Sequence, residues 1–202
     1  HNTFDKKSMK VLCNYKGSFG YDINKRLRNI DITRIEADEH PLYEEYSKAT
    51  KTVEKNKLVQ KYIRDIDKYI VYFNQAFAVA PTFKRDTILY RIIFDSAKYM
   101  PPIGQPVTLN GYISCSFDIT KVIYYYGGLT QLSNPSKDED PMILKINVKK
   151  GVPYIFLDAF CLDKYDMMDK EGEIVLPHGL TLQLTKKLKP LKHIKIYEAE
   201  LY

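Results

Sequence analysis

Three groups of polar residues interrupt apolar, strand-like stretches of this 202-residue chain. An arginine can grip a phosphate with two parallel hydrogen bonds, and hydroxyls can orient a polar ligand. A carboxylate can stabilise a developing positive charge or accept a proton. The three groups are Arg91, Ser114-Cys115-Ser116 and Glu171-Gly172-Glu173.

The two glutamates stand directly before an apolar run, residues 174–176, which is followed by Pro177. Because side chains alternate along a strand, Glu171 and Glu173 are predicted to share one face while Gly172 points away. Two carboxylates about 6–7 Å apart on one face repel each other, so their presence there requires an explanation. A solvated strand end is the ordinary reason, and the segment 198–200, Glu-Ala-Glu, repeats the bare pattern near the C-terminus.

The arginine and the serines add weight to the first glutamate pair. Arg91 is the only charged residue in the β-prone run 87–94. Because burying its charge unpaired is costly, Arg91 must face a cleft, an anion or an ion-pair partner. Ser114 and Ser116 are predicted to share one strand face, with the small, fairly apolar Cys115 packed on the other. Ordinary serines that flank a turn are the alternative explanation.

Hydrophobic spacing predicts which elements position these residues. Residues 21–28 and 55–79 have helical periodicity, and Pro81 ends the longer helix. Short strands without regular βα alternation follow from Arg85, which predicts an α+β fold. We expect one domain over residues 1–202, mainly helical at 1–84 and β-rich at 85–202. Strands are expected at 87–94, 107–109, 112–117, 142–148, 153–157, 171–176, 180–184 and 194–197.

Composition narrows the classes of function. The 31 basic and 25 acidic residues give a net charge of +6, which suits an anionic cofactor or an acidic partner as well as solvated strand ends. Nucleic acid is not an expected partner, because no zinc-finger spacing or RNA-binding aromatic signature is present. No apolar run approaches the roughly 18 residues of a membrane span. Three scattered cysteines and four histidines without ligand spacing predict neither a disulfide framework nor a metal site.

In their order along the chain, the arginine, serine and glutamate groups resemble the signatures of mono-ADP-ribosyltransferases. The chain is similar to the family's arginine / Ser-Thr-Ser / Glu-X-Glu group, which contains clostridial-type toxins and phage enzymes. The resemblance covers most of residues 10–185, including 21–28 as the family's first helix and 110–116 as its serine strand. It implies an N-terminal helical lobe followed by a mixed, mainly antiparallel β-sandwich core.

The resemblance also implies roles for individual residues, with NAD as co-substrate and no metal. Glu173 would stabilise the positive charge on the ribose, Ser114 would hold that carboxylate, and Glu171 would accept the proton of an acceptor arginine. Cys115 departs from the usual Thr, and Ile92 from a frequent Gly. The implied catalytic residues are Glu173, Glu171, Ser114 and Arg91; the implied NAD-binding residues are Arg91, Ile92, Ser114, Ser116 and Phe117; the candidates for target recognition are Phe160 and Tyr165.

The predicted activity is transfer of ADP-ribose from NAD to an arginine of a target protein, with release of nicotinamide. An NAD glycohydrolase is one alternative, and a non-catalytic binding module that keeps the NAD cleft is another. The intact Arg91, Ser114 and Glu173 argue against the module. Actin, a small GTPase, a ribosomal protein or RNA polymerase would all suit the cleft. The short chain favours a soluble effector or toxin subunit, or a phage or viral enzyme, acting in a host-cell cytoplasm.

Overall fold

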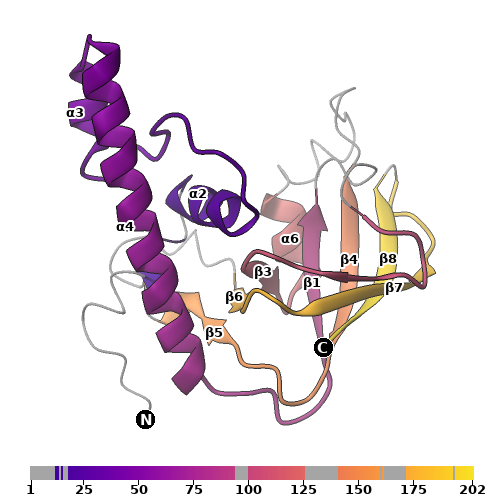
Figure 1. Ribbon diagram of the computed structural model, residues 1–202. Coiled ribbons are helices and arrows are strands. Elements are labelled where there is room, and N and C mark those ends of the chain that lie inside the picture. Colours follow the sequence, from indigo (N-terminus) through magenta and orange to yellow (C-terminus); the bar gives the residue numbers. More distant parts are fainter. Residues whose placement is uncertain are drawn as a thin grey trace. The chain divides into compact units, whose positions relative to one another are not determined.

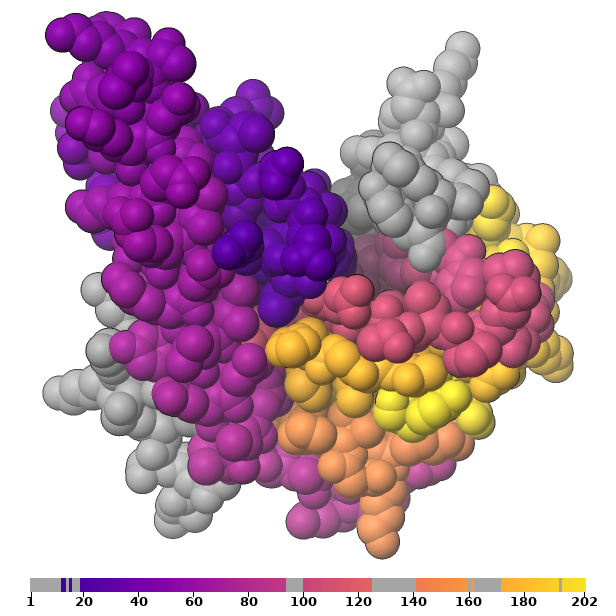
Figure 2. Space-filling model, in the orientation of Figure 1, coloured from indigo at the N-terminus to yellow at the C-terminus, as the bar shows by residue number. Residues whose placement is uncertain are grey.

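The computed structural model describes residues 12–13, 15, 18–93, 100–125, 141–159, 161, 172–192 and 194–202. The chain divides into two compact units: His1–Ala80 with Ala159–Lys164, and Pro81–Asp158 with Tyr165–Tyr202. The first unit contains helices α2 to α4, and the second contains the sheet (Figure 1). The same sequence colours mark both parts of the chain in the space-filling view (Figure 2). This succession of helices and then strands confirms the predicted α+β fold.

The helical unit is built from α2 (Ser18–Leu27), α3 (Tyr43–Lys48) and α4 (Thr52–Val79). Both predicted helices are confirmed, although each begins earlier than expected. The buried side chains of α4 recur at the spacing of one helix face, as the sequence predicts: Leu58, Val59, Tyr62, Ile66, Phe73, Ala76 and Phe77. Among the described helices, none is both long enough and apolar enough to cross a membrane.

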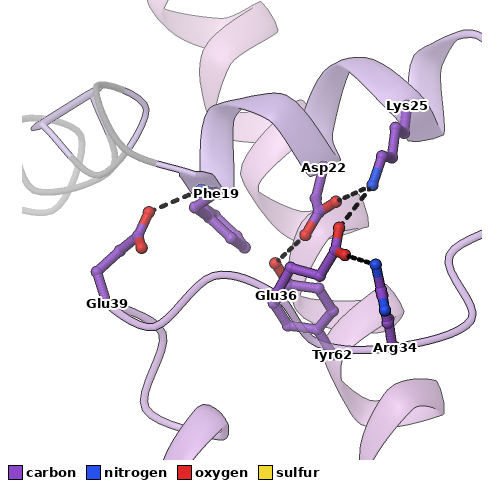
Figure 3. Close-up of polar contacts among 7 residues, drawn as sticks. All are labelled: Phe19, Asp22, Lys25, Arg34, Glu36, Glu39 and Tyr62. Carbon is purple, nitrogen blue, oxygen red and sulfur yellow. Dashed lines mark hydrogen bonds and ion pairs between the residues drawn. The ribbon is translucent and has the colours of Figure 1, made fainter.

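A buried carboxylate organises the polar contacts of the helical unit (Figure 3). Asp22 exposes only 1% of its surface and accepts a 2.7 Å hydrogen bond from the Tyr62 hydroxyl. Its other oxygen lies 3.1 Å from Lys25 Nζ, which also pairs with Glu36 at 3.1 Å. Burial, reinforced by the bond to Asp22, raises the pKa of Tyr62, so the phenol keeps its proton. These contacts join α2 to α4 and to the segment that follows α2.

A disulfide joins Cys13 to Cys161 within the helical unit, with 5.4 Å between the Cα atoms. Scattered positions in the sequence gave no sign of this bridge, because its two residues are 148 positions apart. In the chain-entropy model, closing so long a loop lowers the conformational entropy of the unfolded chain, which raises its free energy by about 5 kcal/mol. The bridge therefore contributes to the stability of the unit, and Cys115 is the buried free cysteine of the described residues.

The described strands form one eight-stranded mixed sheet in the order β2-β7-β8-β4-β1-β3-β6-β5. The pairing of β4 with β8 is parallel, and the other described pairings are antiparallel. The predicted mixed, mainly antiparallel architecture is confirmed. The strands are β1 (Thr87–Ile93), β2 (Pro106–Thr108), β3 (Ile113–Ser116), β4 (Met142–Val148), β5 (Ile155–Phe156), β6 (Glu173–Leu176), β7 (Thr181–Lys187) and β8 (Lys195–Leu201).

The sheet curves around a core to which strands from both of its ends contribute. Figure 1 shows β7 crossing in front of β1 and β4, and Leu89, Ile174 and Leu184 of three different strands belong to one buried cluster. On the other face, helix α6 (Ile119–Tyr125) packs Val122 against Ile143 of β4. Strands β1 and β4 are therefore covered on both faces, which explains why their sequences are apolar without regular alternation.

Candidate active site

The serine strand and the glutamate strand are direct neighbours in the sheet. The β3–β6 register places Ser116 opposite Glu173 and Ser114 opposite Val175. The two serines therefore share one face, as predicted, and Glu173 lies on that face too. The direct neighbour of Glu173 is Ser116. Ser114 lies two residues earlier on the same face of β3, and its predicted role of holding the Glu173 carboxylate stays a prediction.

Glu173 is the first residue of β6 and exposes only 9% of its surface. A buried carboxylate requires polar partners, and the cross-strand position of Ser116 supplies a hydroxyl next to it. Ser116 is itself buried, and its Oγ accepts a 3.2 Å hydrogen bond from the Asp118 N–H. The backbone at the end of β3 therefore fixes this serine, which leaves Glu173 in a shielded, ordered environment.

Arg91 contacts the serine strand β3 from β1, its neighbour on the side away from β6. Its Nη1 donates a 2.7 Å hydrogen bond to the carbonyl oxygen of Ser114, while the ladder pairs its neighbour Tyr90 with Ser116. Within the described part of the chain, no carboxylate forms an ion pair with Arg91. The structure thus brings the predicted arginine and serine groups together on adjacent strands.

The backbone before Glu173 departs from the prediction. We expected Glu171 and Glu173 to alternate along one strand, but β6 begins at Glu173 and Gly172 has φ +63°. A residue in this left-handed region is not extended, so strand alternation does not carry back through Gly172. Glu171 lies outside the described residues, and its place on the face of Glu173 stays a prediction. The Gly172 N–H donates a 2.7 Å hydrogen bond to Oδ2 of Asp158. Sequence analysis missed Asp158, since a single acidic residue after a short strand forms no pattern.

The other predicted site residues lie in different surroundings. Phe117 follows β3 with 52% of its surface exposed, whereas the Ile92 side chain packs against the cluster of Val122 and Ile143. Cys115 is buried in the main core on the face opposite Ser116, as predicted. Burial raises the pKa of its thiol to about 12, so it is protonated at neutral pH. Three predicted residues, Phe160, Tyr165 and Glu171, lie outside the described residues.

The second Glu-X-Glu segment has a structural explanation. Glu198 and Glu200 belong to β8, and each lies 3.0 Å from a lysine Nζ of the neighbouring strand region, Lys145 and Lys149 respectively. Ala199 between them is buried in the core. These glutamates are the outward residues of a core strand, paired with cations, which matches the alternative of an ordinary acidic strand.

The described residues contain no group of three or more His, Cys, Asp or Glu side chains that could hold a metal ion. The hydroxyl beside Glu173 belongs to Ser116, and the Arg91 guanidinium contacts the same serine strand at the Ser114 carbonyl. Tyr90 of β1 shares the face of Ser116 and Glu173, so strand alternation places the Arg91 side chain on the opposite face. A guanidinium suits an anionic ligand, and a carboxylate suits a developing positive charge.

Among comparisons with known proteins, a family model identifies the family and solved structures show the fold. The family model described as ADP-ribosyltransferase exoenzyme matches residues 2–198. A search of curated protein sequences found no significant match.

Three solved structures illustrate the likeness in fold. The Vis toxin of Vibrio splendidus is 13% identical with a TM-score of 0.59, and the match covers 98% of this chain and 73% of that one. The C3 exoenzyme of Clostridium limosum is 16% identical with a TM-score of 0.60, covering 99% and 87%. The ADP-ribosylating toxin BECa of C. perfringens, solved with NADH, is 14% identical with a TM-score of 0.63, covering 98% and 43%. With nearly its whole length matched by the family model, this chain belongs to the ADP-ribosyltransferase exoenzyme family.

Proposed function

We propose that this chain transfers ADP-ribose from NAD to an arginine side chain of a target protein. The observation that carries the proposal is the buried carboxylate of Glu173, which lies opposite Ser116 of β3. Arg91 donates a hydrogen bond to the same strand, at the carbonyl of Ser114. Members of this family use NAD, which carries both an anionic pyrophosphate for Arg91 and a ribose that becomes cationic beside Glu173.

The proposed reaction assigns each charge of NAD to one side chain. The Arg91 guanidinium binds the pyrophosphate, for which its fork of N–H donors is suited. As the bond between nicotinamide and ribose breaks, its electron pair leaves with nicotinamide and positive charge develops on the sugar. Glu173 stabilises that charge, and its shielded position strengthens the interaction. An acceptor guanidino nitrogen then bonds to the ribose carbon and gives up a proton.

Arginine as the acceptor rests on Glu171, the first residue of the Glu-Gly-Glu segment. In the proposed mechanism Glu171 receives the acceptor guanidinium by charge and takes the released proton. Phe160 and Tyr165 precede it in the sequence and are the proposed contacts with the target protein. Several structures similar in fold are named as toxins, which supports a target protein inside a host cell, reached as a secreted effector or made there by a phage or virus.

The experiment is a nicotinamide-release assay with NAD alone and with NAD plus agmatine, a small guanidine that mimics arginine. We expect agmatine to increase nicotinamide release and to appear as ADP-ribosyl-agmatine in mass spectrometry. Equal release in both samples, with free ADP-ribose as the product, would instead identify an NAD glycohydrolase. No release under either condition, from protein whose folding is confirmed by circular dichroism, would contradict both activities and favour a binding module.

Replacing Arg91 by lysine should weaken NAD binding although the net charge is unchanged. A lysine ammonium cannot form the bidentate phosphate contact, and it also loses the planar fork that reaches the Ser114 carbonyl. We expect the Kd for NAD to rise about tenfold, the equivalent of about 1.4 kcal/mol. Calorimetric titration measures this change, and an unaltered Kd would mean that Arg91 does not contact the pyrophosphate.

A further inference from the structure

A turn of unusual conformation lies directly before Glu173. Strand β5 pairs with β6 at Ile155 with Val175 and at Phe156 with Ile174. After these two pairs the backbone of β5 turns into a 3-10 helix, Leu157–Ala159, and leaves the ladder. Asp158, in this 3-10 helix, then accepts the Gly172 N–H at 2.7 Å through its side chain. A carboxylate thus continues the hydrogen bonding of the sheet at the point where the backbone no longer can.

The surroundings leave this turn little freedom. Asp158 exposes 9% of its surface, and neighbouring Leu157 is fully buried, so the carboxylate is held in place by the core. Gly172 has φ +63°, and a Cβ at this position would lie 3.3 Å from Ser116 Oγ. Gly172 is therefore confined between Asp158 on one side and Ser116 on the other. The residue that follows in the chain is Glu173.

We propose that Asp158 is a positioning residue for Glu173, an inference that rests on the proposed function. Its carboxylate fixes the left-handed turn at Gly172 and thereby the direction in which β6 presents Glu173. A charged acceptor makes a stronger hydrogen bond to a backbone N–H than a neutral one does. A displacement of about 1 Å at a reacting group can cost about 10²-fold in rate, so loosening this turn should lower turnover.

The test compares Asp158→Ala, Asp158→Asn and a matched control, Asp86→Ala. Asparagine keeps the size and an acceptor oxygen, whereas alanine removes the acceptor. Asp86 also accepts a backbone N–H through its side chain, from Lys150 at 2.9 Å, but on the exposed surface before β1. The measurements are kcat and KM for nicotinamide release from NAD, the melting temperature, and the hydrogen-exchange rate of the Gly172 amide by NMR.

We expect Asp158→Ala to lower kcat about 10- to 100-fold with KM for NAD within about twofold, and to speed exchange of the Gly172 amide. Asp158→Asn should retain at least about a third of the wild-type kcat, and its Gly172 amide should still exchange slowly. Asp86→Ala should match the wild type in both measurements. If the Ala variant does not fold, the Asn variant decides. Asparagine keeps an acceptor oxygen, so a folded Asp158→Asn protein whose kcat falls by about 100-fold overturns the role of Asp158 as acceptor of the Gly172 N–H.

The outcomes separate this inference from the proposed function. An active wild type with an equally active Asp158→Ala variant overturns the role of Asp158 alone. So does a loss of kcat in Asp158→Ala while the Gly172 amide remains protected, because the turn would then be intact. A wild-type chain that releases no nicotinamide overturns the proposed function itself, and the positioning role with it, whatever the exchange rates are.

Discussion

Replacing Glu173 by glutamine is expected to abolish transfer of ADP-ribose and to suppress NAD hydrolysis by at least about 10²- to 10³-fold. The amide keeps the shape of the side chain and its place opposite Ser116 but loses the charge that stabilises the ribose cation. Since Glu173 is largely buried, water cannot replace that charge easily. Nicotinamide release, measured with and without agmatine, gives both activities.

Glu198→Gln is the matched control for this variant. Glu198 begins the other Glu-X-Glu segment and is partly exposed beside Lys145 on the sheet. Loss of such an exposed ion pair changes stability by about 1 kcal/mol or less, so both activities should remain within about twofold of the wild type. Near-normal rates in a folded Glu173→Gln protein would show that the carboxylate at position 173 does not stabilise the reacting sugar.

Replacing Glu171 by glutamine should separate the two activities. In the proposed mechanism this residue acts on the arginine acceptor and not on NAD, so modification of agmatine should fall about 10²- to 10⁴-fold, the usual range for general-base assistance. Hydrolysis of NAD by water should decrease much less. The ratio of ADP-ribosyl-agmatine to free ADP-ribose, from one protein preparation, measures the separation.

Two other outcomes are informative for Glu171. If both activities stay near the wild-type values, the residue is an ordinary solvated side chain and arginine specificity lies elsewhere. If both fall together, it supports the NAD site directly and the proposed division between the two glutamates is wrong. The left-handed Gly172 makes this test necessary, because strand alternation no longer places the two carboxylates side by side.

The sequence predicts the fold well where burial dictates the pattern. The α4 periodicity and the continuous apolar stretches of β1 and β4 follow from one buried helix face and two doubly covered strands. The shared face of Ser114 and Ser116 was predictable for the same reason, since alternation holds within β3. These features depend on near neighbours in the chain, which sequence patterns record.

The features that the sequence does not predict depend on residues distant in the chain or on backbone conformation. The Cys13–Cys161 bridge and the Asp22–Tyr62 hydrogen bond join positions that carry no joint pattern. Gly172 breaks the alternation because its φ is positive, and its partner Asp158 comes from another strand's end. Lys145 of β4 and Lys149, which follows β4, pair with Glu198 and Glu200 and distinguish this segment from Glu171-Gly172-Glu173. The parallel pairing of β4 with β8 brings these lysines close, and the sequence does not show that pairing.

The central claim is most directly tested by incubating a host-cell lysate with isotopically labelled NAD and this protein, then identifying the labelled residue by fragmentation mass spectrometry. We predict label on arginine side chains of one or a few proteins, with none when Glu173→Gln replaces the wild type. Label on asparagine or another residue would contradict arginine specificity, and an unlabelled lysate with no nicotinamide released would contradict the transferase itself.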